Sequence, residues 1–467
     1  MSASLITQQR PAQVSMPVGE VYVIATEYVE AGRLDAADRL LGHILASSPN
    51  QTDALHLRGL IAFRRGRVPE AAQMMERALR TGPSRALHHR NMSEVYRQLS
   101  RLDEATQSAK RAISLDGNDP LGWFNLAMAE YDNLHIDDAI AAARKALEIK
   151  PDLPEGHMKL GQSLLLQGQF AEGWEEYEWR YKIPGAAPLM PTTDRPQWDG
   201  SPMPNERLLL IGDQGYGDVI MFGRFIAWAQ ARCAHVTVAC SQEMRGIVAQ
   251  LAPGAGIAVR WDDCPPYAAY CPLSGLPRLA KIGLAELPGH VGYLKPEPDA
   301  VSRWSARLNE LVPHGQKRIA IAWAGRPTHN NDRNRSITLN QLEPLAAIPG
   351  VTLISMQKGP AAAQCKTWAG QAPLIDLDTE ITTFEDSAAI LSAVDVLISV
   401  DTSLVHLAGA LGRQSWVMLP YAPDWRWQMH RADTPWYPSL RLFRQPTPRD
   451  WPTLIANVAS ELATAKF

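Results

Sequence analysis

Residues 120–153 read PLGWFNLAMAEYDNLHIDDAIAAARKALEIKPDL, and this stretch decides the fold of the N-terminal part of the chain. Small residues stand at its eighth and twentieth positions, Ala127 and Ala139. Two antiparallel helices approach closely where side chains are small. Pro151, at position thirty-two, stands where the second helix should stop, because proline cannot continue a helix. The stretch therefore predicts a pair of packed helices.

The same pattern returns with a period of 34 residues, so that units begin at residues 18, 52, 86, 120 and 154. The eighth and twentieth positions are small in every unit: Ala25, Gly59, Ser93, Ala127, Gly161 and Ala37, Ala71, Ala105, Ala139, Gly173. Apolar residues between them supply the face that neighbouring units bury, among them Tyr28, Leu41, Leu55, Tyr96, Trp123, Leu126 and Leu160. We therefore predict five helical repeats over residues 18–184, after a tail at 1–17.

These units resemble the tetratricopeptide family. The resemblance implies a superhelix of stacked helix pairs whose concave groove binds peptides. The fifth unit departs from the pattern at Arg180, where the earlier units carry Ile44, Ala78, Ala112 and Ala146. We expect its aromatic-rich second helix, GWEEYEWRYKIP, to dock onto the next part of the chain and not onto a sixth repeat.

Composition excludes several classes of protein. Forty-six basic against 49 acidic residues, a net charge of −3, give no reason to expect nucleic-acid binding. No apolar run approaches the roughly 18 residues that span a bilayer, and residues 1–11 do not resemble a secretory signal. The five cysteines lack metal-ligand or disulfide-framework spacing, which favours thiols in a reducing cytoplasm.

The character of the chain changes after a proline-rich linker predicted at 185–206. Apolar runs typical of strands come next, with helix-length segments between many of them: 208–211, 236–239, 257–259, 319–323, 352–356 and 396–400. Strands that alternate with helices predict parallel sheets covered on both faces. We expect two such domains, at 207–312 and 313–467.

Ligands of open parallel sheets bind where loops leave the carboxyl ends of the strands. The first such segment, GDQGYGD at 212–218, holds Gly215 and Gly217, which let the backbone approach a bound group. Its spacing is not that of a dinucleotide fingerprint, and no phosphate-loop lysine comes after it. Asp218 at its end is either a helix cap or a catalytic base, and the residues alone leave both open.

Two further segments point to an anionic ligand. Arg326, His329, Arg333 and Arg335 follow the strand at 319–323, and guanidinium groups bind phosphate oxygens in pairs, although a solvated loop would read the same way. After the strand at 396–400, Asp401, Thr402 and Ser403 open a helix whose amides form a phosphate site. His406, further along that helix, is either a core histidine or a ligand contact. The pair Asp376 and Asp378 has no other ligand cluster nearby, so we expect no metal there.

These segments together resemble two-domain GT-B glycosyltransferases of the bacterial heptosyltransferase superfamily, in particular the subgroup fused to tetratricopeptide repeats. The matching stretches are GDQGYGD at 212–218, AWAGRPTHNNDRNRS at 322–336, SVDTSLVHLAGALG at 399–412 and PDWRWQMHRADTPWYPSLRLFRQ at 423–445. The resemblance implies an α/β GT-B module of two Rossmann-like domains after the all-α superhelix. It also implies metal-independent, inverting transfer of a sugar from a nucleotide-activated donor, with no cofactor.

Carried over by position, the resemblance implies that Asp218 deprotonates the acceptor. Arg335, with its neighbour Arg333, would contact phosphate, and Gln357 with Lys358 would contact the ribose or base. Asp401, Thr402, Ser403 and His406 match the D-T-G-x-x-H nucleotide-sugar segment, with serine in place of glycine. Trp425, Arg426, Trp436 and Tyr437 are typical of the repeat-fused subgroup and receive no role.

Three hypotheses about function remain open. The first is a glycosyltransferase whose repeats hold a protein acceptor, with flagellin as one possibility that the resemblance offers. The second is an enzyme acting on a glycan or lipid-linked saccharide, with repeats that dock a partner. The third is a non-enzymatic adaptor with a degenerate transferase module.

Overall fold

The computed structural model describes residues 16–184, 191–213, 215–260, 263–287, 292–329, 331–370 and 372–466. Most of the predicted tail at 1–17 and the start of the predicted linker, residues 185–190, lie outside these ranges. The chain divides into two compact units. One comprises Met1–Asn133 with Glu148–Pro151, and the other comprises Leu134–Leu147 with Asp152–Phe467.

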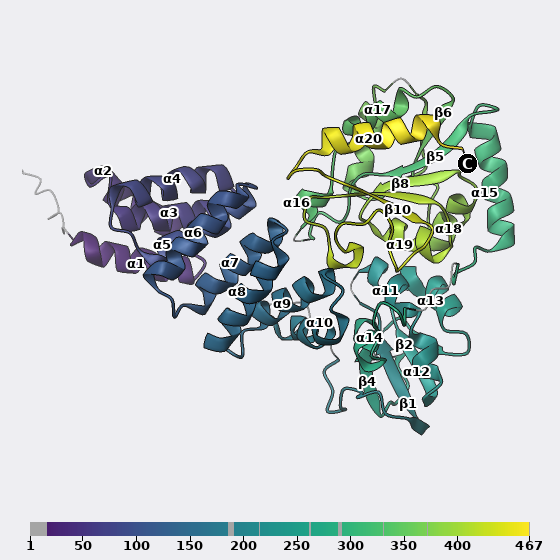
Figure 1. The fold of residues 1–467 in the computed structure, drawn as a ribbon, viewed down its shortest axis with the longest axis horizontal. Coiled ribbons are helices and arrows are strands. Elements are labelled where there is room, and N and C mark those ends of the chain that lie inside the picture. Colours follow the sequence, from purple (N-terminus) through teal and green to yellow (C-terminus); the bar gives the residue numbers. More distant parts are fainter. Residues whose placement is uncertain are drawn as a thin grey trace, which may run out of the picture. The chain divides into compact units, whose positions relative to one another are not determined.

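The N-terminal region consists of paired helices (Figure 1). Their bounds are α1 (Val18–Glu30), α2 (Leu34–Ser47), α3 (Thr52–Arg64), α4 (Val68–Thr81), α5 (Ala86–Gln98), α6 (Leu102–Leu115), α7 (Pro120–Asp132), α8 (Ile136–Ile149), α9 (Pro154–Leu166) and α10 (Phe170–Tyr177). The first helix of each pair begins at the residue where the 34-residue period places a repeat start. Repeat helices in this region are therefore confirmed.

In the second and third pairs, the small residues of the repeat lie where the two helices meet. A Cβ atom added to Gly59 on α3 would lie 2.7 Å from Cγ of Met75 and 3.3 Å from the carbonyl oxygen of Ala71, both on α4. In the next pair, the Ser93 hydroxyl donates a hydrogen bond of 2.8 Å to the carbonyl oxygen of Ala105. Larger side chains at these positions would force the helices apart, which explains the small-residue pattern.

The fifth pair ends differently from the others. Its second helix, α10, continues as a 3₁₀ turn, η1 (Glu178–Lys182), and not as a full helix. Trp174 on α10 is buried, and its indole N–H donates a hydrogen bond of 2.9 Å to the carbonyl oxygen of Ile282. The expected docking of this helix onto the following α/β region is confirmed.

The α/β region begins with a four-stranded parallel sheet in the order β3-β2-β1-β4. Its strands are β1 (Met203–Ile211), β2 (Cys233–Ala239), β3 (Gly256–Ala258) and β4 (Ala269–Pro272), with helices α11 (Tyr216–Gly223), α12 (Ile226–Gln230), α13 (Arg245–Leu251) and α14 (Leu276–Leu279). Strand β1 starts inside the predicted linker. Before it, Trp198 is buried and its backbone N–H bonds to the carbonyl oxygen of Tyr270 at 2.8 Å, so the described part of the linker is an ordered strap.

A six-stranded parallel sheet comes next, in the order β10-β9-β8-β5-β6-β7. Its strands are β5 (Lys317–Ala322), β6 (Val351–Ser355), β7 (Leu374–Asp376), β8 (Val396–Val400), β9 (Ser415–Leu419) and β10 (Leu440–Arg444). The helices of this part include α15 (Pro298–Leu311), α16 (Asp332–Arg335), α17 (Glu343–Ala346), α18 (Phe384–Ser392), α19 (Ser403–Ala410) and α20 (Trp451–Thr464). Helices α17 and α20 lie on one side of the sheet and α18 and α19 on the other (Figure 1).

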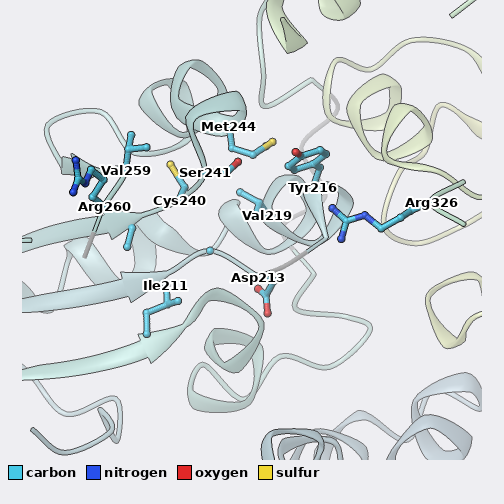
Figure 2. A pocket seen from close by; sticks show the side chains of 12 residues that line it. Ile211, Asp213, Tyr216, Val219, Cys240, Ser241, Met244, Val259, Arg260 and Arg326 are labelled. Atoms are coloured by element: carbon cyan, nitrogen blue, oxygen red, sulfur yellow. The ribbon is translucent and has the colours of Figure 1, made fainter. Parts of the chain in front are cut away.

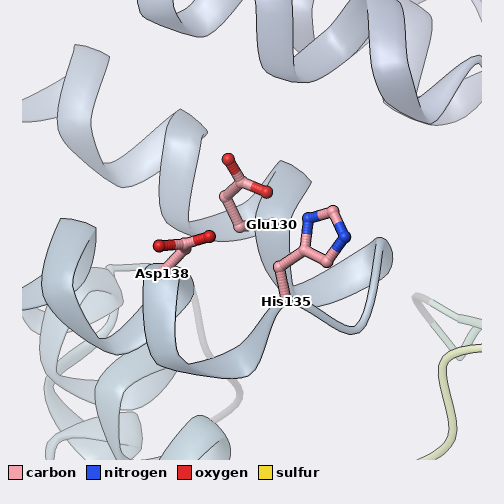
Figure 3. A group of neighbouring side chains, drawn as sticks. All are labelled: Glu130, His135 and Asp138. Atoms are coloured by element: carbon pink, nitrogen blue, oxygen red, sulfur yellow. The ribbon is translucent and has the colours of Figure 1, made fainter.

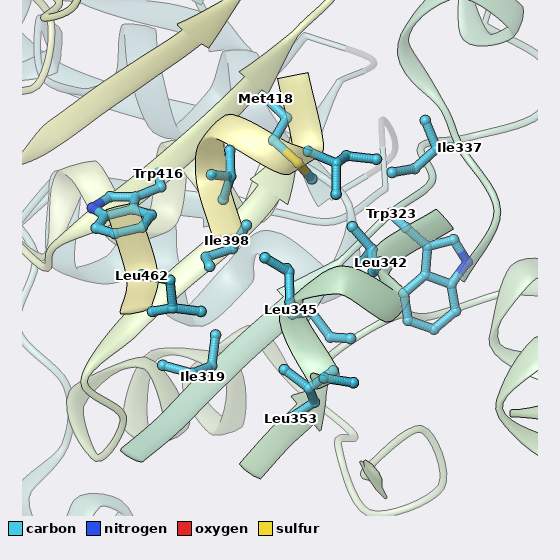
Figure 4. Close-up of a cluster of buried hydrophobic side chains, with 14 of the residues drawn as sticks. Ile319, Trp323, Ile337, Leu342, Leu345, Leu353, Ile398, Trp416, Met418 and Leu462 are labelled. Carbon is cyan, nitrogen blue, oxygen red and sulfur yellow. The ribbon is translucent and has the colours of Figure 1, made fainter. Parts of the chain in front are cut away.

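A large apolar core joins this second sheet to α17 and α20 (Figure 4). Ile319 and Ile398 from adjacent strands are fully buried, as are Leu345 on α17 and Leu462 on α20. Burying side chains of this size contributes about 1.5–3 kcal/mol each. The core holds β5 and β8 rigidly, and the loops that leave their carboxyl ends carry two of the predicted site segments.

Both sheets share one topological feature. In each, the first strand of the sheet lies between the second and the fourth, so the strand order reverses beside β1 and beside β5. Ligands of such sheets bind in the crevice at the carboxyl ends of these strands. In the part of the chain that the structure describes, none of the helices combines the length and apolar character needed to cross a membrane.

Candidate functional site

Asp218 lies in the first turn of α11, the helix after β1. Gly215 is the residue that caps this helix, so the interpretation of Asp218 as the helix cap is wrong. Its carboxylate instead faces another part of the chain, where Oδ1 accepts a hydrogen bond of 2.6 Å from Nη2 of Arg426. Arg426 lies in the segment after β9, in a short 3₁₀ turn, η7 (Trp425–Trp427).

Arg426 is a buried cation held by two carboxylates. Its Nη1 donates to Oδ1 of Asp424 at 2.7 Å, and its guanidinium carbon lies 4.3 Å from the centre of the Trp425 ring. Burial alone would lower the pKa of Arg426, but Asp218 and Asp424 raise it well above its ordinary value. Sequence reasoning gave Arg426 no role, and its only signal was its place in the WRW stretch.

Gly217 and His406, both predicted to bind the nucleotide sugar, pack against each other. A Cβ atom added to Gly217 would lie 2.6 Å from Cδ2 of the His406 ring. His406 is buried on α19, and its Nδ1 lies 2.9 Å from the hydroxyl of Tyr437. Burial lowers the pKa of His406 to about 3, and the nearby Arg426 acts in the same direction. His406 is therefore neutral and helps to join α11 to α19.

The N-terminus of α19 carries Asp401, Thr402 and Ser403 as predicted. Thr402 is the capping residue, but its side chain makes no capping hydrogen bond to the helix. Its hydroxyl lies instead 3.2 Å from that of Ser399. Burial raises the pKa of Asp401 to about 6, as does the neighbouring Asp424, while Arg335 opposes the shift. The first amides of α19 thus lie near both a carboxyl group and a guanidinium group.

Arg335 is the inward-facing arginine of the loop after β5. Its side chain is 15% exposed, and a Cβ atom on Gly325 would lie 2.5 Å from its Nη2. Its Nε donates to Oδ1 of Asp332 at 3.5 Å. Within the described ranges, Nη1 and Nη2 donate no hydrogen bond, so both remain available to a ligand. Arg333, on the same short helix α16, is exposed.

Gln357 and Lys358 make other contacts than the predicted one to a ribose or base. Oε1 of Gln357 accepts from the amides of Trp323 and Ala324 at 3.0 and 2.9 Å, and Nε2 donates to two carbonyl oxygens. This bonding uses every donor and acceptor of the buried amide, so Gln357 braces the loop after β5 and the structure gives the predicted contact no support. The Lys358 ammonium group pairs with Asp378 at 3.0 Å.

A cavity of about 510 Å³ opens at the carboxyl ends of β1, β2 and β3 (Figure 2). Its lining residues are Ile211, Gly212, Asp213, Tyr216, Val219, Ala239, Cys240, Ser241, Met244, Val259, Arg260 and Arg326. Arg326 comes from the loop after β5, and its side chain reaches toward Tyr216 in Figure 2. The cavity therefore receives side chains from both sheets' loops.

Asp213 is a site residue that sequence reasoning missed, although it stands inside the GDQGYGD segment. Its Oδ2 accepts from the amide of Ser274 at 3.0 Å, and its Oδ1 accepts from the Ser274 hydroxyl. Burial raises the pKa of Asp213 to about 6, as does the nearby carboxylate of Asp218, while Arg180 opposes the shift. Two carboxyl groups in different environments thus lie close enough to interact electrostatically, a pattern typical of acid–base sites.

Glu130, His135 and Asp138 belong to the repeats and not to this site. Glu130 on α7 is buried and pairs with Lys110 at 2.9 Å. His135 and Asp138 come after it in the sequence, before and within α8 (Figure 3). We assign these groups no ligand.

Comparison with known proteins identifies the helical region. The tetratricopeptide repeat family model matches residues 22–86, 69–122 and 124–178. Protein FlbA of Caulobacter vibrioides is 28% identical over 342 residues, which cover 64% of this chain and 53% of that protein. The chain thus spans about half the length of this curated relative.

Among solved structures, a MamA chain (residues 41 to the end) from Desulfovibrio magneticus RS-1 is 16% identical, with a TM-score of 0.33, and covers 36% of this chain and 97% of its own. YrrB, described as a TPR protein with an unusual peptide-binding site, is 18% identical with a TM-score of 0.32, over 36% of this chain and 88% of its own. The N-terminal helical region of this chain is built from tetratricopeptide repeats, and an α/β region with parallel sheets comes after it.

Proposed function

We propose that the chain is a glycosyltransferase of the GT-B type, which moves a sugar from a nucleotide-activated donor to an acceptor. The observation that carries the proposal is the Arg335 guanidinium, which lies close enough to Asp401, the residue before the N-cap of α19, to oppose the rise in the pKa of that carboxyl group. Within the described residues, Nη1 and Nη2 of this largely buried guanidinium donate no hydrogen bond, and the helix terminus has no side-chain cap, so the two together suit a diphosphate. Positive charge in such a place favours an anionic ligand.

The acceptor side of the proposed site is formed by the loop after β1. Asp218 is held by Arg426 through Oδ1, and Oδ2 has no hydrogen-bond partner among the described residues. We propose that this oxygen accepts the proton of the acceptor hydroxyl. Asp218 is therefore the proposed general base, oriented by the guanidinium that binds its other oxygen.

The proposed reaction is a single displacement. The acceptor oxygen forms a bond to the anomeric carbon of the donor sugar while the bond from that carbon to the phosphate oxygen breaks. The proton of the acceptor hydroxyl passes to Asp218, and the nucleotide leaves with the bonding electron pair. Arg335 and the amides of Ser403 and Leu404 stabilise the charge that develops on the leaving phosphate. The configuration at the anomeric carbon inverts.

The repeats support a protein as the acceptor or as a docking partner, since stacked helix pairs of this family form peptide-binding surfaces. Flagellin is one candidate acceptor among proteins. A glycan or lipid-linked acceptor, with the repeats holding a partner, is the second candidate for the same enzyme. A non-enzymatic adaptor would not need Arg335 donors that point away from every described partner except Asp332.

Two measurements on the full chain test the proposal. A set of nucleotide sugars is first screened for a rise in the unfolding midpoint, because only a ligand that binds the native state raises it. With a donor that binds, Asp218→Asn should keep that rise and lose at least about a hundredfold in transfer or donor hydrolysis. The matched control is Asp299→Asn, an exposed carboxylate on α15. Full turnover by Asp218→Asn would show that Asp218 is not the general base. If no nucleotide sugar raises the unfolding midpoint, the adaptor hypothesis is favoured.

A further inference from the structure

The last repeat makes contacts to the α/β region that a simple spacer would not need. Arg180 on η1 stands at a position that is small or aliphatic in the four earlier repeats. Its side chain is 13% exposed and lies over the rings of Tyr177 and Tyr181, at 4.3 and 4.0 Å from their centres. Its guanidinium also pairs with Glu178 at 3.1 Å. These contacts hold the Arg180 guanidinium in one position.

The first path runs from Arg180 to the cavity. Nη2 of Arg180 donates to the hydroxyl of Ser274 at 2.8 Å, and the hydroxyl of Tyr181 lies at the same distance from that oxygen. Ser274 comes after β4 and in turn donates both its hydroxyl and its amide to the carboxylate of Asp213. Ser274 thus links the repeat to the cavity wall. Its two hydrogen bonds, one to each carboxylate oxygen, orient the side chain of Asp213.

The second path runs from Trp174 to Asp218. The Trp174 ring meets the Trp425 ring edge to face, with centres 5.3 Å apart and planes at 90°. Trp425 packs under the guanidinium of Arg426, which binds Asp218. Tyr177 touches the same Trp425 ring at 5.8 Å. The last two elements of the fifth repeat, α10 and η1, therefore support the groups that hold both carboxylates of the site.

We propose that the fifth repeat is a positioning element of the transfer site, in which Arg180 fixes Asp213 through Ser274 and Trp174 fixes Arg426 through Trp425. The inference rests on the proposed function, and it goes further by making the last repeat part of the enzyme. The consequence is that the fifth repeat belongs to the same compact unit as the proposed site. Changes at α10 and η1 should act on the chemistry and not only on the capture of an acceptor.

The pH dependence of transfer offers a sensitive readout. Charged and titratable groups face Asp213 from each element around it: Arg180 and Tyr181 on η1, Asp218 on α11, Cys271 on β4, and across the cavity Arg326. Of these, Asp218 raises the pKa of Asp213 and Arg180 lowers it. The acid limb of the pH–rate profile therefore reports the charges that surround Asp213.

The decisive experiment compares three full-length variants at one donor concentration across pH 4.5–8. Arg180→Met should lose at least tenfold in kcat with little change in the KM for the donor. Its acid limb should move to higher pH, because a positive charge beside Asp213 is gone. Arg180→Lys should recover part of the wild-type kcat, and its acid limb should return most of the way to the wild-type pH. The control is Arg144→Met on α8, which breaks an exposed ion pair to Glu172 on α10, the helix that η1 continues.

A second measurement separates this proposal from the proposed function. The unfolding midpoint is compared for Arg180→Met, Asp213→Asn and the double variant. If Arg180 acts on Asp213, Arg180→Met should lower the midpoint less in the Asp213→Asn background than in the wild type. Equal shifts in both backgrounds, or an Arg180→Met enzyme no slower than Arg144→Met, would overturn the positioning role. If the midpoint shifts of Arg180→Met and Asp213→Asn are coupled but the protein transfers no sugar, the contact from Arg180 to Asp213 stands and the proposed transferase function is rejected.

Discussion

The guanidinium of Arg426 lies 2.6 Å from Oδ1 of Asp218, although 208 positions of the chain separate them. Asp218 belongs to the first parallel sheet's loops and Arg426 to those of the second. The ion pair therefore joins the two sheets at the carboxylate that we propose as the general base. The other terminal nitrogen of Arg426, Nη1, pairs with Asp424, so the guanidinium lies between two carboxylates.

We predict that Arg426→Met destabilises the chain by about 3 kcal/mol, because breaking a buried ion pair leaves a carboxylate without its partner. Urea unfolding at neutral pH measures the change. Arg431→Met is the matched control, since Arg431 pairs with a largely exposed Asp433 and should cost less than about 1 kcal/mol. Equal losses in both variants would show that Arg426 contributes only as a surface charge would.

Gly217→Ala should separate α11 from α19. The added Cβ would lie 2.6 Å from the ring of His406, which is buried and held by Tyr437, so the ring cannot turn away freely. We expect a loss of about 1–3 kcal/mol in the free energy of unfolding, as in overpacked cores. Gly42→Ala is the control: nothing lies within 4 Å of its added Cβ, and on helix α2 it should stabilise slightly. An unperturbed Gly217→Ala protein would mean that the two helices separate at little cost.

Arg335→Met should weaken binding of a nucleotide donor by about 10–100-fold, which corresponds to the loss of a charge-assisted pair of hydrogen bonds. Titration calorimetry with the donor found in the thermal screen measures the affinity. Arg303→Met, whose side chain is 69% exposed on α15, serves as the control and should bind normally. If both variants bind the donor like the wild type, Arg335 does not contact the phosphates of the donor.

Asp401→Asn should change how stability depends on pH. The native pKa of about 6 lies above the ordinary 3.8, so between these values the native state holds a proton that the unfolded chain releases. This contribution to stability is present below about pH 4 and is lost as the pH rises through about 6. The asparagine variant lacks that loss, so its stability relative to the wild type should rise across the window by at most about 3 kcal/mol. Denaturant unfolding at several pH values checks this, and a flat difference, as expected for Asp299→Asn, would contradict it.

Gly161→Ala should disrupt the last repeat. Its added Cβ would lie 2.6 Å from the backbone nitrogen and 2.9 Å from Cα of Tyr177, and backbone atoms cannot yield as a flexible side chain can. Gly122→Ala on α7 provides the comparison, because its closest neighbour lies at 3.6 Å. We expect the first to cost more than about 1 kcal/mol and the second to stabilise by up to about 1 kcal/mol. Circular dichroism during urea unfolding distinguishes the two.

Much of the fold could be predicted because its signals are local. The repeat starts follow from a period that small residues and helix-ending residues mark, and strands β1, β2, β3, β5, β6 and β8 appear as apolar runs. Strands β4, β7, β9 and β10 were missed. β4 and β7 have only four and three residues, β9 comes after α19 and a short turn, and arginines interrupt the apolar pattern of β10. Length and periodicity are too weak there to separate a strand from a loop.

For the site, the sequence by itself determined which segments come directly after the strands, and so it placed Asp218, Arg335 and Asp401 at the ligand edges of the sheets. Only the tertiary structure decided that Arg426 holds Asp218, that Gln357 braces a loop, and that Arg180 reaches Asp213 through Ser274. The physical reason is the range of each interaction. Periodicity and helix capping act between near neighbours in the chain, whereas these hydrogen bonds join residues up to 208 positions apart and exist only once the sheets have packed.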